Sequence, residues 1–183
     1  MLLTHTDLRD LVAAGVILGV PRSHINGASI DVTLGSRLWI EAPPRGLETV
    51  VDLMAKGGPH LEPVDLLACH YYDLAPGQFC LAATAETFYL PDNIAAEFKL
   101  KSSLARAGLN HALAGFADPG WTGSVLTLEL TNTLRWHSLR LRPGMKAGQC
   151  IFFKGNPVPQ HASYATRGQY NHDRAAQPSK GVQ

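Results

Sequence analysis

Residues able to carry out chemistry are concentrated between Lys101 and Glu129. The segment KSSLARAGLNHALAGFADPGWTGSVLTLE contains two adjacent serines, an arginine, an aspartate before a turn, a tryptophan and a glutamate. A carboxylate can act as a general base, and a lysine beside two serines can bind an anion. The stretch therefore contains candidates for a general base and for an anion site.

The first part of this stretch predicts a short helix that begins at Ser102. The residues after the serines are good helix formers, and Gly108 suits the position just past a helix end. Both seryl hydroxyls, the free amides of the first turn and Lys101 would then converge, which creates a phosphate site. The alternative is that Ser102 only caps the helix and that Lys101 is a solvated cation.

A tight turn and an alternating strand follow. Residues 117–121, ADPGW, favour a turn because proline fixes φ and glycine permits positive φ. Asp118 there could close an Asx-turn, or accept a sugar hydroxyl that the ring of Trp121 covers. Residues 124–132 alternate, which places Glu129 opposite the leucines. Glu129 is either a solvated strand residue or, if its face lines a pocket, a candidate general base.

Short alternating segments recur along the second half of the chain, separated by turn-forming residues. They cover residues 78–83, 87–90, 95–100, 124–132, 139–141 and 149–154. Residues 29–41 also alternate enough for a strand or hairpin. This regular succession of short strands and turns predicts an all-β sandwich or barrel with one or two small helices.

Composition excludes several classes of protein. A chain of 183 residues with a net charge of +1 is consistent with one core and lacks the basic surface of a nucleic-acid-binding protein. The three cysteines lack metal-site spacing and suggest buried thiols in a reducing compartment. We find no signal peptide or membrane span, so we expect a cytoplasmic protein. Zinc-dependent deamination is not favoured, because His60 and Glu62 form an H-x-E but no C-x-x-C occurs.

Several motifs, in chain order, resemble the dCTP deaminases of the trimeric dUTPase-like superfamily. They are INGASIDVTLG (25–35), LPDNI (90–94), KSSLARAGL (101–109), AGFADPGWTG (114–123), LTLEL (126–130) and LRPGMKAGQCIFF (141–153). The resemblance implies a mainly β, dUTPase-like distorted barrel or jelly-roll over residues 1–160. It also implies a flexible C-terminal lid over residues 161–183 and a homotrimer with active sites between subunits.

The same resemblance implies deamination of dCTP to dUTP with release of ammonia and without zinc. Glu129 matches the glutamate that takes a proton from water and passes it toward N3 and the leaving ammonia. Ser102 and Arg106 match residues that position the water and stabilise charge near C4 of cytosine. The backbone carbonyl near Ala114 is a further partner for the water.

Substrate binding is also implied residue by residue. Asp118 matches the aspartate that binds the deoxyribose 3′-hydroxyl, and Trp121 would pack near the sugar or at a subunit boundary. The expected triphosphate contacts are Lys101, Ser103 and Gln149. In the tail, Tyr170 and a cation, Arg174 or Arg167, complete the substrate-binding set. Mg²⁺ would be carried by the phosphates.

Two other functions remain open from the sequence. One is a dUTP diphosphatase, or a bifunctional enzyme that converts dCTP to dUMP. The other is a non-catalytic nucleotide-binding trimer, suggested by altered spacing around Asp118 and by Asp173, where an anion stands in the tail. His111, a lone histidine expected in a turn, is interpreted as a packing or surface residue.

Overall fold

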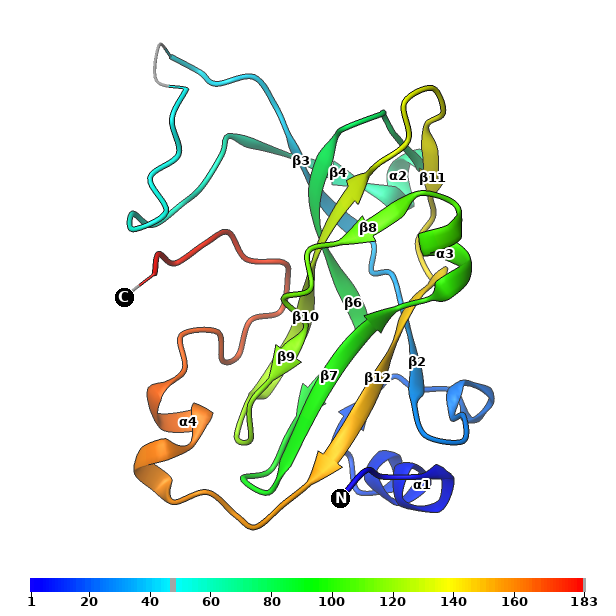
Figure 1. The fold of residues 1–183 in the computed structure, drawn as a ribbon, viewed down its shortest axis with the longest axis vertical. Helices are drawn as coiled ribbons and strands as arrows, with labels where there is room; N and C mark the ends of the chain where they lie inside the picture. Colours follow the sequence, from blue (N-terminus) through cyan, green and yellow to red (C-terminus); the bar gives the residue numbers. More distant parts are fainter. Residues whose placement is uncertain (47–48, 183) are drawn as a thin grey trace.

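The computed structural model describes residues 1–46 and 49–182 and is built mainly from β-strands (Figure 1). The larger sheet is antiparallel, and β1 (Ile17–Leu18) joins it by pairing with β6. Its other strands, in spatial order, are β4 (Leu61–Asp65), β3 (Arg37–Glu41), β6 (Phe79–Tyr89), β10 (Thr122–Asn132) and β8 (Leu109–His111). β6 and β10 form the centre of this sheet.

A second sheet and a small strand pair complete the β structure. The second sheet has the order β2 (Ile30–Thr33), β12 (Lys146–Lys154), β7 (Ile94–Leu100) and β9 (Phe116–Ala117), and β5 (Tyr72–Leu74) pairs with β11 (Leu139–Leu141). The helices are short. They are α1 (His5–Ala13), α2 (Leu66–Cys69), α3 (Ser102–Arg106) and α4 (Tyr164–Arg167), with 3₁₀ turns at Arg22–His24 and Gln160–Ala162.

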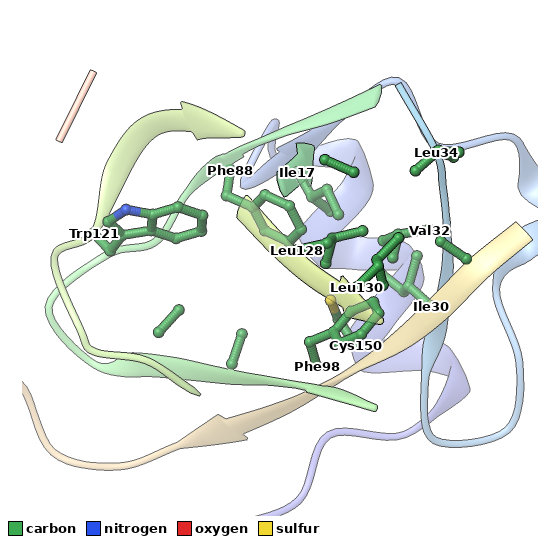
Figure 2. Packing of buried hydrophobic residues seen from close by; sticks show 14 of the residues in the cluster. Ile17, Ile30, Val32, Leu34, Phe88, Phe98, Trp121, Leu128, Leu130 and Cys150 are labelled. Carbon is green, nitrogen blue, oxygen red and sulfur yellow. The ribbon is translucent and has the colours of Figure 1, made fainter. Parts of the chain in front are cut away.

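The core lies between the two sheets. Leu128 and Leu130 of the larger sheet share one buried cluster with Ile30, Phe98 and Cys150 of the second sheet (Figure 2). Alternation along β10 buries these leucines and leaves the residue between them on the other face. The predicted mainly β class with few short helices is confirmed.

The chain after β12 folds back over the larger sheet (Figure 1). The amide of Val125 donates to the carbonyl of Asp173, and the amide of His172 donates to the carbonyl of Thr122. Further along, Ala176 is buried against Leu81 and Ala83 of β6. The tail up to residue 182 is thus packed and hydrogen-bonded in this structure, and residue 183 lies outside the described part. A flexible lid over 161–183 stays a prediction.

One glycine in the turn before β10 and one at the start of the strand permit this close approach. A Cβ on Gly120 would lie 2.2 Å from the Ser163 hydroxyl, and one on Gly123 would lie 2.5 Å from His172 Nδ1. Both glycines have positive φ, 88° and 68°. Side chains at these positions would push the tail away from the turn.

Three expectations about local structure require correction. The two strands expected at residues 78–83 and 87–90 are one continuous strand, β6, over Phe79–Tyr89. Residues 29–41 do not form a hairpin, because β2 and β3 belong to different sheets. Cys80 and Cys150 are buried as expected, but Cys69 is exposed. No helix among the described residues is long and apolar enough to cross a membrane.

Candidate active site

A cavity of about 450 Å³ lies between β10, the segment that includes β9, and the folded-back tail. Five of the residues expected at the site line it: Ala114, Asp118, Trp121, Glu129 and Tyr170. The rest of its wall includes apolar side chains of β6 and β10, residues 57–59 and further residues of the tail, among them Asp173. A mostly apolar cavity with a few polar groups is the usual form of a small-molecule site.

Glu129 reaches this cavity because β10 alternates and is irregular. Register shifts interrupt its pairing with β6 between Thr122 and Ser124 and between Val125 and Thr127. Such bulges add a residue to one strand and re-aim the side chains that follow. Beyond them Glu129 stands opposite Leu81 of β6, and 26% of its side chain is exposed.

His111 lies against Glu129, which the sequence did not predict. Its Nε2 is 3.3 Å from Glu129 Oε2, and its side chain is only 3% exposed. His111 is the last residue of β8 and pairs with Leu130 of β10, so it belongs to a strand rather than to a turn. The signal was the two-residue spacing from Leu109, which puts both side chains on the buried face.

Trp121 joins the cavity to the core. Its ring is 5.3 Å from that of Phe88, centroid to centroid, at the edge of the buried cluster (Figure 2). The indole Nε1–H donates to the carbonyl oxygen of Tyr170 at 2.6 Å. One side chain therefore serves as core packing, as cavity wall and as an anchor for the tail.

Asp118 holds the turn with its backbone and contacts the tail with its side chain. Its carbonyl accepts from the amide of Trp121 at 3.2 Å, while Arg167 Nη2 lies 3.3 Å from Oδ2 of the carboxylate. Both partners of this ion pair are substantially exposed. The carboxylate can therefore exchange Arg167 for another hydrogen-bond donor at small cost.

A second polar cluster surrounds Asp31 on β2. Its carboxylate receives hydrogen bonds from Lys101 at 2.7 Å, Lys146 at 2.8 Å and Asn26 at 2.9 Å. Burial of Asp31 favours a higher pKa, but these hydrogen bonds outweigh it and lower the pKa of Asp31 to about 2. Gln149 adjoins the cluster, because its Oε1 accepts from the Ser29 hydroxyl at 3.3 Å.

The remaining expected residues lie apart from the cavity. Ser102, Ser103 and Arg106 are exposed on α3, and none of them lines the cavity. The helix starts at Ser102 as expected, although the N-cap position falls on Lys101 and has no side-chain cap. In Figure 1, α3 and the tail lie on opposite sides of β9 and β10. Arg174 lines a different hollow, together with Arg37.

Within a single chain, the expected site is thus divided into two groups. Glu129, Ala114, Asp118, Trp121 and Tyr170 share the cavity. Lys101, which directly precedes α3, and Gln149 belong to the Asp31 cluster. Among residues 1–46 and 49–182, no group of three or more His, Cys, Asp or Glu side chains could hold a metal ion.

Comparisons with known proteins identify the class. The sequence model of the dCTP deaminase-like family matches residues 2–155. The chain belongs to this family, which confirms the resemblance of its motifs.

Two relatives and one solved structure illustrate the similarity. The dUMP-forming dCTP deaminase of Rhodococcus jostii is 36% identical over 186 residues, covering 98% of this chain and 96% of that protein. The dUMP-forming dCTP deaminase of Nocardioides sp. is 46% identical over 115 residues, covering 60% of this chain and 58% of that protein. The 2′-deoxycytidine 5′-triphosphate deaminase of Agrobacterium tumefaciens superposes with a TM-score of 0.66 at 22% identity, over 84% of this chain and 48% of that one. That likeness supports the fold alone.

Proposed function

We propose that this protein deaminates dCTP and cleaves the product to dUMP, releasing ammonia and pyrophosphate. The observation that carries the proposal is Glu129, a carboxylate on the wall of a cavity otherwise formed largely by apolar side chains and the Asp118–Trp121 turn. We prefer dUMP to dUTP as the end product, because a relative that matches over nearly its whole length carries the name dUMP-forming. The expectation from the sequence, in which dUTP was the end product, is changed accordingly.

The deamination step needs one base and one source of water. Glu129 takes a proton from the water that attacks C4, and returns protons to N3 and to the departing amino group, so that dCTP and water give dUTP and ammonia. The apolar wall limits competing solvent and strengthens hydrogen bonds to the developing charge. Ser102 and Arg106 would position the water and stabilise that charge.

Phosphoanhydride cleavage needs a second directed water. Besides Glu129, the cavity wall includes the carboxylates of Asp118 and Asp173. Each has a nearby tail cation, Arg167 at 3.3 Å and Lys180 at 3.2 Å, respectively. The site thus contains candidate bases for a water aimed at the α-phosphate, the requirement for conversion of dUTP and water to dUMP and pyrophosphate.

The divided arrangement supports a site shared between copies of the chain. Ser102 and Arg106 are exposed on α3 and away from the cavity that contains Glu129 of the same chain. If α3 of a neighbouring copy covers the cavity, Ser102 and Arg106 of that copy lie beside Glu129 of this one. A cyclic homotrimer supplies three such equivalent contacts through one kind of interface.

The Asp31 cluster suits the triphosphate end of the substrate. Lys101 and Lys146 bring two ammonium groups together, with Gln149 and the exposed serines of α3 close in sequence or space. The Asp31 carboxylate is already occupied by these lysines, so the cluster offers cations to phosphate rather than carboxylates to a metal. Mg²⁺ would be held mainly through the phosphates themselves.

The tail would act as the lid. Tyr170 lines the cavity, and the tail carries Arg167 and Arg174 on either side of it. Closure of such a segment over bound nucleotide would exclude water from the reaction. When substrate enters, the Asp118 carboxylate would release Arg167 of the tail and accept a hydrogen bond from the sugar 3′-hydroxyl.

Product analysis tests the proposal. Purified protein is incubated with dCTP and Mg²⁺ after chelator treatment, and ammonia, dUTP, dUMP and pyrophosphate are measured over time. We expect ammonia and dUMP in equal amounts. Ammonia with dUTP alone would restrict the enzyme to deamination. Tight binding of dCTP and dUTP without any turnover would favour the non-catalytic trimer.

A further inference from the structure

The contact between His111 and Glu129 has no role in the function described so far. We propose that His111 is a positioning residue that donates its Nε2–H to Oε2 of Glu129 and thereby directs the catalytic proton to the other oxygen, Oε1. The inference rests on the proposed function of Glu129 as the base.

The two facing atoms are matched by distance and by burial. Nε2 of His111 and Oε2 of Glu129 lie 3.3 Å apart. Both atoms are buried from solvent, and neither has a hydrogen-bond partner among the described residues, because the pair lies within ion-pair distance but is not aligned for a hydrogen bond. A buried donor or acceptor without a partner is costly, so a small rotation that aligns the pair is favoured. Catalytic hydrogen bonds are often long in a free enzyme and tighten when substrate binds.

The surroundings of the imidazole restrict its movement. The ring of Phe98 on β7 packs against it, with centroids 4.8 Å apart and planes inclined by 53°. On the neighbouring strand His111 is paired with Leu130, and the amide of Ala112 donates to the carbonyl of Glu129 at 3.3 Å. His111 is therefore held by packing and backbone pairing, which keep its Nε2 close to the carboxylate.

Among the described charged groups on the elements around His111, Glu129 is the one that its imidazole contacts. On β7, Glu97 and Lys99 form an ion pair with each other. On α3, which precedes β8, Arg106 is exposed. Among the described residues, the ion-pair contacts of His111 comprise Glu129 on β10 alone.

This arrangement makes the two carboxylate oxygens unequal. Oε2 faces an N–H, so a proton there would eliminate the hydrogen bond from His111 and create an opposed pair of donors. The first proton taken from water therefore resides on Oε1, from which it passes to N3 and stays there in the uracil product. The second, released by the new hydroxyl at C4 as the C4–N bond breaks, passes by way of the same oxygen to the amino group, which leaves as ammonia. The N–H of His111 is not transferred, and His111 leaves the reaction unchanged.

Kinetics of two substitutions test the positioning role. His111→Phe keeps the aromatic packing but removes the donor, while His111→Gln retains an N–H. We expect His111→Phe to lower kcat for ammonia release by roughly 100-fold, with KM changed by less than about threefold, because the base loses its alignment. The kcat of His111→Gln should be at least about tenfold higher than that of His111→Phe.

A matched control separates this effect from general destabilisation. His24 also has a buried ring nitrogen without a partner among the described residues, but it lies in the 3₁₀ turn at residues 22–24, outside the cavity lining. His24→Phe should retain kcat even if the melting temperature falls. Unchanged kcat in His111→Phe, or equal kcat in the Phe and Gln variants, would overturn the proposal.

A measurement without turnover distinguishes this inference from the proposed function. In the free protein, proton NMR should detect an exchange-protected imidazole N–H that disappears in His111→Phe and shifts or disappears in Glu129→Leu. A protected signal unaffected by Glu129→Leu would refute the contact. If the signal behaves as expected but dCTP is not deaminated, the pair exists and the proposed function fails.

Discussion

The indole Nε1–H of Trp121 donates a 2.6 Å hydrogen bond to the backbone carbonyl of Tyr170. This bond joins the turn that precedes β10 to a residue of the tail 49 positions later in the chain. Because both residues line the cavity, the fold of the tail and the shape of the cavity are coupled. Changes at either residue should alter tail order and substrate affinity together.

Trp121→Phe should loosen the tail. The substitution keeps a ring against Phe88 but removes the donor to Tyr170, and one hydrogen bond contributes about 0.5–1.5 kcal/mol to stability. We expect a melting temperature lower by roughly 2–6 °C for a chain of this size, with faster hydrogen exchange in residues 164–180. Trp136, which is exposed, offers the same substitution as a control and should change neither measurement.

Asp31→Asn should destabilise the protein at neutral pH and less so in acid. The folded-state pKa of about 2 lies below the ordinary 3.8, so the charged carboxylate stabilises the fold above pH 4, and this is lost as pH falls toward 2. The shift corresponds to roughly 2 kcal/mol. Unfolding titrations at pH 7 and pH 3 should show the difference between variant and wild type shrinking in acid.

The exposed Asp73 provides the matched control for that experiment. Its carboxylate pairs with Arg140 at 2.7 Å, but both side chains are largely exposed. Asp73→Asn should therefore have a much smaller effect at pH 7. If Asp31→Asn and Asp73→Asn lowered the free energy of unfolding at pH 7 equally, the buried Asp31 cluster would not be the more stabilising of the two.

Glu86→Gln should have the opposite dependence on pH. Burial raises the pKa of Glu86 above its ordinary 4.5, although hydrogen bonds from Thr33 oppose the rise. The fold therefore prefers the protonated acid, and the stability that this supplies below pH 4.5 is lost as pH rises through the raised pKa. We expect a higher melting temperature for the variant than for wild type at pH 7 and no gain near pH 4. A variant less stable than wild type at pH 7 would contradict this sign.

Hybrid oligomers test whether the site is shared. Glu129→Gln and Arg106→Ala should each abolish deamination, but co-assembly of equal amounts should restore about a quarter of the sites, because one interface can contain both native residues. The readout is ammonia release after co-refolding. Sites built within one chain would give no recovery, and separately refolded samples mixed afterwards serve as the control.

Much of the fold could be predicted because its signals are local. The alternation around Glu129 correctly predicted the buried leucines and the opposite face of β10, and Gly108 has the positive φ expected just beyond α3. The continuity of β6 was missed, since two polar residues, Glu86 and Thr84, interrupt the apolar pattern, although Thr84 is buried. Its hydroxyl donates to the Glu86 carbonyl and accepts from the Leu126 amide, contacts that no local pattern reveals.

The site was less predictable because it depends on contacts between distant segments. The sequence motifs identified Glu129 and Asp118, which the structure places on one cavity wall, but they could not show that α3 lies elsewhere in the same chain. His111 was assigned to packing because nothing in its immediate sequence indicates Glu129, 18 residues further along. The pairing of β8 with β10 brings them together.

The most direct test of the account is ammonia release from dCTP by Glu129→Gln, compared with wild type and with Glu62→Gln, a control at an exposed position of β4. The glutamine side chain retains the shape of the glutamate but cannot accept the proton from water. The account predicts loss of ammonia release by at least about 1,000-fold, with dCTP still bound and the melting temperature close to that of wild type. Ammonia release at the wild-type rate by a folded Glu129→Gln protein would contradict the assignment of Glu129 as the base.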